Sequence, residues 1–353
     1  METHNSFFAM IMDGMKNAPL MPELPKPPVR EHTPQENMNL LLQHKKPYYV
    51  PIGADNNLVI PDVVLERPAL NKGGRDWFGV EWEYVPGINA PSIKPGFVLF
   101  EEIEDWEETL KFPDLDAIDW EKNAKLLAPE LKPGKNNSFV LFNGCFERIH
   151  SLMGFENALV AMATEPEETL RLFQALADYK IALIDKLVQY YPVDTIVYHD
   201  DWGAQKSTFF SVPMFKELLY EPTRRIVEHV HSLGKNFTMH CCGRVETLVP
   251  YMLEMGVDSW ESAQMDINDL PALRKQYGSK LSMEVVPKMP ALMNPSATEE
   301  EVRSAMRDFI VTLAKDGPMI ITRLACCPAT AYWVYDEYYK VADSIYKDAP
   351  EWE

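Results

Sequence analysis

The sequence of 353 residues predicts an α/β fold, a (β/α)8 TIM barrel preceded by an N-terminal arm. The main observation is a pattern that recurs four times in the second half, where a helical stretch ends at a glycine and a short apolar run follows. The glycines are Gly234, Gly256, Gly278 and Gly317. Glycine after a helix is typical of a left-handed C-terminal cap, and helix, glycine and strand in series predict parallel strands with helical crossovers. Three or four further strands in the first half make a closed barrel the simplest arrangement.

A doubly wound open sheet is the alternative architecture, because it also alternates strands and helices. No Gly-rich phosphate loop follows a strand in this sequence, so nucleotide binding has no support. The barrel is therefore the predicted fold.

Residues 1–34 are expected to form an N-terminal arm, because a short apolar segment leads into a proline run that favours extended backbone over helix. The prolines are Pro19, Pro22, Pro25, Pro27, Pro28 and Pro34. The arm is expected to wrap the domain or, in a homodimer, a second subunit, and a loosely ordered tail is the alternative. The catalytic barrel domain is expected to cover residues 35–353.

The first helix of the barrel domain is predicted to follow Thr33 as its N-cap. Pro34 lies in the first turn and Glu36 closes a capping box with Thr33. Residues 47–55 predict a first short strand. Proline and acidic residues are frequent at about 86–137, and we expect this segment to be an excursion over the barrel mouth.

Two further strands are predicted at 139–144 and 193–203, on either side of the longest helical pattern. Thr164 and Glu167 are expected to form a capping box where that helix begins. The second of these strands ends in the run His199 to Trp202.

A metal site is predicted where another strand ends, because His240 and Cys242 stand two residues apart there. Side chains two apart on a strand point the same way, and imidazole and thiolate are both zinc ligands. Cys326 and Cys327 follow a later apolar run, and one of them would supply a third ligand. Three protein ligands leave a fourth position open, as in a catalytic zinc site. The alternative is a chance spacing among buried cysteines, although four of the five cysteines lie in these two clusters.

Further polar residues fall at predicted strand ends, which in such barrels is the face of the active site. His199, Asp200 and Asp201 are candidates for proton delivery or for orienting a substrate, and the alternative for one aspartate is a helix cap. Glu261 and Glu284 are candidates for substrate binding or for holding His240 in one tautomer.

Aromatic side chains are the candidates for an apolar substrate slot, and ordinary core packing is the alternative. They are Trp77, Phe78, Trp82, Tyr84 and Trp202.

Composition excludes several classes of function. A net charge of −19 argues against nucleic acid and against a polyanionic substrate, unless a local basic pocket exists. Transmembrane helices need about 18 consecutive apolar residues, and the sequence has no such run. No signal peptide is recognisable at the N-terminus, and the low cysteine count favours a reducing cytoplasm.

With these residues in place, the chain resembles the uroporphyrinogen decarboxylase superfamily over roughly residues 33–345. Within it, the chain resembles the cobamide-dependent methyltransferases, which include methylcobamide:coenzyme M methyltransferases and corrinoid-dependent O-demethylase components. The resemblance is carried by the segments TPQENMNLLLQHKKPYYVPI, DWFGVEWEY, DDWGAQKSTFFSVPMFKELLYEPTRRI, HCCGRVETLVPYMLEMGVDSWE and ACCPAT.

This resemblance implies a zinc ion held by His240, Cys242 and Cys326, with Cys327 as the alternative to Cys326. It implies a methyl group moving between a small substrate and the cobalt of a corrinoid carried by a partner protein. O-demethylation of a methoxylated aromatic is the favoured reaction, and methyl transfer to a thiol such as coenzyme M is the alternative.

The chain departs from true uroporphyrinogen decarboxylases, which carry an arginine-rich N-terminal segment and need no metal. Here only Arg30, Arg67 and Arg75 precede Arg148. Decarboxylation of a polyacid is therefore the less favoured alternative, and a zinc-stabilised binding protein without chemistry is the remaining one.

Overall fold

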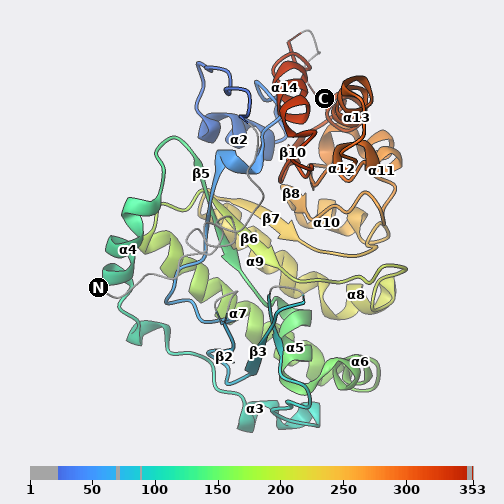
Figure 1. Cartoon of the computed structure of the whole chain (residues 1–353). Helices are drawn as coiled ribbons and strands as arrows, with labels where there is room; N and C mark the ends of the chain where they lie inside the picture. The colour runs from blue at the N-terminus through green and yellow to red at the C-terminus, as the bar shows by residue number, and fades with distance from the viewer. Residues whose placement is uncertain (1–22, 69–71, 88–89, 348–351, 353) are drawn as a thin grey trace.

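Seven parallel strands form the central sheet of the computed structural model, which describes residues 23–68, 72–87, 90–347 and 352. The strands are β1 (Asn56–Val59), β5 (Asn136–Leu141), β6 (Thr195–His199), β7 (Asn236–His240), β8 (Ser259–Glu261), β9 (Met283–Val285) and β10 (Met319–Ile321). They pair in this same order, and helices lie between successive strands (Figure 1). A doubly wound sheet reverses its strand order at a switch point. The order seen here is that of a TIM barrel, so the predicted fold is confirmed.

The described part of the chain has seven parallel strands in this sheet where eight were expected, because the strand predicted at 47–55 is reduced to a single bridge. Ile52 bridges Ile321 of β10 in parallel, and the amide of Ile321 donates to the carbonyl oxygen of Pro51 at 2.9 Å. The chain then turns into the 3-10 helix η1 (Gly53–Asp55). A Cβ atom at Gly53 would lie 2.0 Å from the carbonyl oxygen of Thr322, so only glycine permits this approach.

The recurring glycines follow the prediction at three of four positions. Gly234, Gly256 and Gly278 have positive φ angles of 69°, 85° and 54°. Gly317 is not among the positive-φ residues, so its prediction as a left-handed cap is wrong. A Cβ atom at Gly317 would meet Nη1 of Arg274 at 2.1 Å and the carbonyl oxygen of Gly278 at 2.5 Å. Close packing, rather than φ, therefore requires glycine at this position.

Most predicted helices are present. The helices are α2 (Pro34–Leu42), α3 (Trp106–Thr109), α4 (Trp120–Leu127), α5 (Cys145–Met153), α6 (Phe155–Thr164), α7 (Pro166–Tyr190), α8 (Val212–Leu218), α9 (Tyr220–Ser232), α10 (Val249–Met255), α11 (Leu270–Tyr277), α12 (Pro290–Met293), α13 (Glu299–Ala314) and α14 (Ala331–Ala342). Besides η1, the 3-10 helices are η2 (Ile103–Asp105), η3 (Leu115–Ala117), η4 (Ala128–Glu130) and η5 (Gly278–Lys280).

The two predicted capping boxes have different outcomes. At α2, Thr33 accepts from the amide of Glu36 and the carboxylate of Glu36 accepts from the amide of Thr33, as predicted. At α7 the predicted box is wrong, because Thr164 is the last residue of α6 and its hydroxyl donates to the carbonyl oxygen of Val160. Glu165 is the N-cap of α7, without a side-chain cap.

A second, three-stranded antiparallel sheet lies between β1 and β5 in the chain, formed by β2 (Gly74–Arg75), β3 (Glu81–Val85) and β4 (Ala90–Ile93). Asp76, in the β2–β3 connection, accepts from the amides of Phe78 and Val80 and from Nε1 of Trp82. Its carboxylate also lies 2.6 Å from Nη1 of Arg148 on α5, with both side chains buried. This buried pair ties the small sheet to the barrel.

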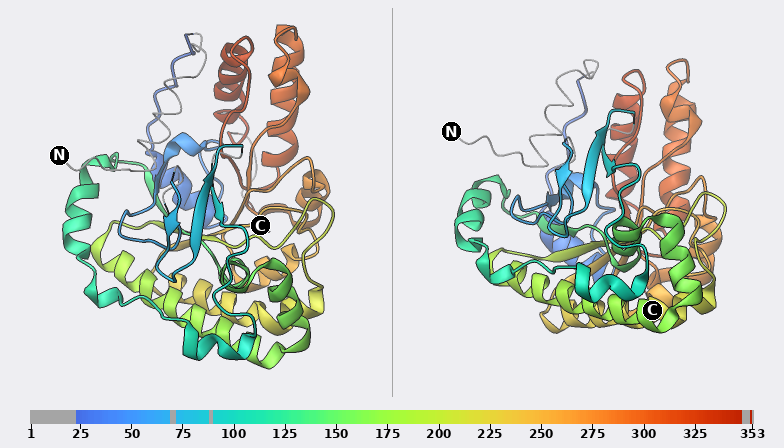
Figure 2. Two further views of the ribbon diagram at one scale, coloured as in Figure 1. Left: turned by 60° about the horizontal axis from the view of Figure 1, so that its bottom comes forward. Right: turned by 90° about the horizontal axis from the view of Figure 1, so that it is seen from below.

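The C-terminal helices α13 and α14 stand side by side (Figure 2). Arg303 on α13 pairs with Asp336 and Glu337 on α14. Residues 1–22 of the predicted arm lie outside the described residues. Within the described part, no helix combines the length and the apolar character that a membrane span requires.

Candidate metal centre

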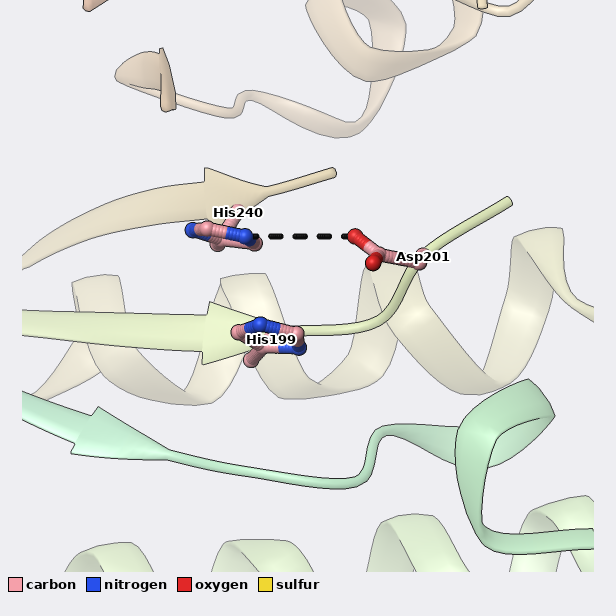
Figure 3. Close-up of side chains that lie close together, drawn as sticks. All are labelled: His199, Asp201 and His240. Carbon is pink, nitrogen blue, oxygen red and sulfur yellow. Dashed lines mark ion pairs between the residues drawn. The ribbon is translucent and has the colours of Figure 1, made fainter. Parts of the chain in front are cut away.

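Two histidines stand together at the C-terminal ends of neighbouring strands. His199 ends β6 and His240 ends β7, and the two residues are partners in the parallel register. Register partners on parallel strands point to the same face. Their rings accordingly stack with centroids 3.9 Å apart and planes 12° apart (Figure 3).

His240 uses its two ring nitrogens differently. Nδ1 lies 3.1 Å from Oε2 of Glu261, the register partner of His240 on β8. Nε2 lies 3.5 Å from Sγ of Cys242 and 3.9 Å from Oδ1 of Asp201, as Figure 3 shows for the aspartate. The carboxylate therefore holds one nitrogen and leaves the other to face a thiol and a second carboxylate. Holding His240 in one tautomer was one of the two roles predicted for Glu261 from the sequence.

Cys242 is held by its own loop. Its amide donates to Oδ1 of Asp201 at 2.7 Å, and its Sγ lies 3.1 Å from Oγ of Ser262. The next residue, Gly243, has a φ of 90°, and a Cβ atom there would lie 2.1 Å from the carbonyl oxygen of Gly203. The loops after β6 and β7 can thus approach closely only because glycine stands at this position.

Asp200 differs from its neighbour Asp201 because it is fully buried. Its carboxylate accepts from the amides of Phe146 and Glu147 in the first turn of α5, and from Nε1 of Trp202. Asp200 therefore caps a helix, which was the alternative predicted for one of the two aspartates. The helix that it caps is α5, which follows β5, and not the next helix along the chain. A Cβ atom at Gly144 would lie 2.3 Å from Cβ of Asp200, which again requires glycine.

The second histidine has a carboxylate partner as well, because Nδ1 of His199 lies 2.9 Å from Oε2 of Glu147 on α5. Burial raises the pKa of Glu147, but the charge and hydrogen bond of His199 outweigh burial and bring this pKa to about 2. Burial and the charge of Glu147 raise the pKa of Asp200 to about 8. Burial lowers the pKa of His240, yet its bonds to Cys242 and Glu261 bring that pKa well above its usual range.

Metal-ligating atoms gather at this point. One atom each from His199, Asp201 and His240 lie within 4.8 Å of one another. Of the ligands expected from the sequence, His240 and Cys242 are brought together. Cys326 instead donates to the carbonyl oxygen of Leu324, and neither Cys326 nor Cys242 belongs to the cluster of His199, Asp201 and His240 found among the described residues.

Cys327, the alternative third ligand, lies with its Sγ 3.4 Å from Oγ1 of Thr330. Burial and the neighbouring Cys327 raise the pKa of Cys326 to about 11. Burial also acts to raise the pKa of Cys327, but hydrogen bonds with Thr330 outweigh it and lower this pKa. Imidazole, thiolate and carboxylate are the ligands of zinc sites, so the donors at the strand ends suit that ion.

The predicted aromatic residues lie mostly in the core. Phe78, Trp82 and Trp202 are buried, as the alternative of ordinary core packing predicts. Trp77 packs partly buried against the core, and Tyr84 is 36% exposed on β3.

Glu284 is buried on β9, beside Glu261, and accepts from Oγ1 of Thr238 at 3.4 Å. Burial and the charge of Glu261 raise the pKa of Glu284 to about 8. Both glutamates line a cavity of about 620 Å³ that small hydroxyl side chains, such as Thr238, also line.

Sequence reasoning missed two residues of this site. Glu147 lies in the first turn of α5 and Ser262 directly follows β8. Neither belongs to a spaced motif. The signal that could have found them is their position just beyond predicted strands.

A model of the uroporphyrinogen decarboxylase (URO-D) family matches residues 75–330, whereas no curated protein matches the chain. A solved methyltransferase from Methanosarcina mazei superposes with a TM-score of 0.64 at 12% identity, covering 88% of this chain and 99% of that one. At this identity the likeness shows the fold alone. A xylose isomerase-like TIM barrel protein from Mycobacterium smegmatis, in complex with magnesium, has a TM-score of 0.34 at 13% identity. It covers 66% of this chain and 81% of that one, and carries no argument.

Proposed function

Because the chain belongs to the uroporphyrinogen decarboxylase (URO-D) family, we propose that it is a zinc-dependent methyltransferase working with a corrinoid protein. The observation that carries this proposal is the pair of His240 Nε2 and Cys242 Sγ, 3.5 Å apart at the C-terminal strand ends of the barrel. A metal-free decarboxylase has no use for such a pair. The fold shared with a methanogen methyltransferase is in line with the proposal.

The residues present fit a zinc ion. His240 and Cys242 would hold it, with Cys326 as third ligand by resemblance, or Asp201 and His199 by their position in the cluster. Zinc, when bound, would supply Lewis-acid activation of the oxygen or sulfur atom that exchanges the methyl group.

The protein's own residues have separable tasks in this proposal. Glu261 fixes the ring of His240 so that Nε2 faces the centre. Ser262 and Asp201 position Cys242 through its thiol and its amide. When another residue completes the zinc site, His199, whose Nδ1 faces Glu147, keeps Nε2 to deliver or hold a proton at the leaving atom of the substrate.

The favoured substrate is a methoxylated aromatic compound, whose demethylation passes the methyl group to the cobalt of a corrinoid carried by a partner protein. The alternative is methyl transfer from the corrinoid to a thiol. Since three of the five candidate aromatic residues are buried in the core, this preference rests on family resemblance. We place the reaction in the cytoplasm and leave a homodimer as the proposed assembly.

The arginines before residue 150 argue against decarboxylation of a polyacid, because most of them already pair with carboxylates of the protein. Of the four arginines before residue 150, Arg30 pairs with Asp343, Arg75 with Glu81 and Arg148 with Asp76. A substrate with many carboxylates would need several cations that are not already paired.

Zinc content and methyl transfer test the proposal together. Elemental mass spectrometry of the wild type, His240→Ala and Cys242→Ala is compared with His229→Ala, which alters a histidine of α9 paired with Asp185. About one zinc per chain is expected in the wild type and in His229→Ala, and none in the other two. Methoxylated aromatics and thiols are then screened by the colour change of a cobalt(I) or methylated corrinoid. A folded wild type purified without chelator and lacking zinc would contradict the proposal.

A further inference from the structure

Arg67 follows Glu66, a residue whose carbonyl oxygen and carboxylate both have partners in the barrel. The carbonyl oxygen of Glu66 accepts from Nη2 of Arg148 at 2.8 Å and from Nδ2 of Asn143 at 2.5 Å. The Glu66 carboxylate pairs with Lys180 at 2.5 Å, and both side chains are buried. The backbone that carries Arg67 is therefore fixed by the barrel itself.

The guanidinium of Arg67, by contrast, has no such partners among the described residues. Its Nε is buried without a hydrogen bond, and in the part of the chain that the structure describes the side chain enters no ion pair. The guanidinium carbon lies 4.4 Å from the ring centroid of Phe142, the residue after β5. A cation held over an aromatic ring gains some energy, but this contact satisfies none of its five N–H groups.

The ring of Phe142 in turn lies beside His199 of the metal centre. The ring centroid of Phe142 lies 5.3 Å from that of His199, and His199 stacks on His240. Burial lowers the pKa of Arg67, while the charges of Glu147 and Asp201 act to raise it. Those carboxylates have partners of their own, because Glu147 pairs with His199 and Asp201 accepts from the amide of Cys242.

A partly buried cation without hydrogen-bond partners is unfavourable unless an anion completes it. The other arginines of the first half are paired, so among them Arg67 is the one whose guanidinium remains to bind an anionic group. Arginine binds planar and tetrahedral oxyanions through its fork of N–H groups.

We propose that Arg67 binds an anionic group of the substrate, a carboxylate or a sulfonate, and so favours anionic methyl donors or acceptors over uncharged ones. This inference rests on the proposed methyltransferase function, because that function defines what the substrate is. The anion site itself consists of Arg67 above Phe142, beside the His199–His240 pair.

The test uses related methoxyarenes that carry either an anionic or an uncharged group. Binding of 4-methoxybenzoate, 4-methoxybenzenesulfonate and the uncharged 4-methoxybenzamide is measured by titration calorimetry on the full chain. Arg67→Gln removes the charge, Arg67→Lys keeps it, and Arg75→Gln is the control, because Arg75 is exposed on the small sheet. Zinc content is measured in each preparation, since carboxylates also bind zinc.

The wild type and Arg75→Gln are expected to bind one of the two anions about 10-fold or more tightly than the amide, as charged hydrogen bonds do. Arg67→Gln should lose that preference at unchanged zinc content, and Arg67→Lys should keep part of it. Which anion binds tighter distinguishes a carboxylate from a sulfonate substrate.

Equal binding of all three probes to the wild type, absence of binding, or an unchanged preference in Arg67→Gln would overturn the inference. His240→Ala separates it from the proposed function. A preference that persists in His240→Ala supports the anion site even if zinc and methyl transfer prove absent.

Discussion

The carboxylate of Glu261 lies 3.1 Å from Nδ1 of His240, and this contact decides which nitrogen faces the metal centre. The two residues are register partners on β7 and β8, so the sheet itself sets them side by side. Burial raises the pKa of Glu261, but the bond to His240 and the charge on that ring outweigh burial and lower it. An ionised carboxylate then accepts from Nδ1 and leaves Nε2 to act as a ligand.

Replacing Glu261 by glutamine or alanine is expected to weaken zinc binding about 10- to 100-fold, as the loss of such a partner does in other zinc sites. Competition with a chromophoric chelator measures the affinity. Glu217→Gln, an exposed change on α8, is the control and should bind zinc as the wild type does. Equal affinity in Glu261→Ala would mean that this contact does not orient His240.

Asp200 is expected to contribute to stability more than to chemistry. Asp200→Ala leaves the amides of Phe146 and Glu147 and the Nε1 of Trp202 without their acceptor. We expect a loss of about 2–4 kcal/mol in the free energy of unfolding, measured with urea, because three buried donors lose their acceptor. Asp200→Asn should lose less, since its amide oxygen still accepts. A variant that unfolds like the wild type but loses activity would point to direct catalysis instead.

The buried pair of Asp76 and Arg148, which ties the small sheet to the barrel, is expected to contribute strongly to stability. Arg148→Met leaves a buried carboxylate uncompensated, and such losses amount to about 3–5 kcal/mol of unfolding free energy. Arg171→Met removes a half-exposed arginine that pairs with Glu107 and Glu168, and should lower the free energy of unfolding much less, because solvent screens exposed pairs. Equal effects of the two substitutions in urea unfolding would contradict the importance of burial.

Glu284 predicts a pH dependence of stability. Its folded-state pKa of about 8 lies above the value of 4.5 expected for an unperturbed glutamate. The folded chain therefore binds more protons here than the unfolded chain. This contribution to stability is fully present below the unfolded pKa and is lost as pH rises through about 8.

Urea unfolding of the wild type and of Glu284→Gln, followed from pH 5 to pH 9, measures this contribution. The wild type should become less stable relative to Glu284→Gln as pH rises, because glutamine does not titrate. Asp200 titrates in both proteins and so cancels in the comparison. A difference that stays constant across this range would show that Glu284 is ionised in the folded chain.

Periodicity and glycine placement allowed most of the barrel to be predicted. The apolar runs from β5 to β10 are strands because parallel strands covered on both faces consist largely of apolar residues. The failures were local. Residues 47–55 look like a strand but make one bridge, since η1 interrupts them, and Thr164 continues α6 instead of capping α7.

The candidate site could be predicted only in part. His240 and Cys242 were recognisable because ligands two residues apart on one strand need no knowledge of the fold. Glu147, Ser262 and Arg67 reach the same place from α5, from the loop after β8 and from the loop after β1. No spacing in the sequence relates them, because their proximity depends on how the sheet curls.

Local sequence patterns were enough to predict the order of the strands, the helix that follows Thr33 and the face on which functional side chains meet. These features follow from local periodicity and from the alternation of side chains along a strand, which each segment carries within itself. The tertiary structure was needed to show that Glu261 holds His240, that Asp200 caps α5 and that Arg67 forms no ion pair within the described residues. These relationships depend on strand register and burial, which arise from the packing of segments far apart in the chain.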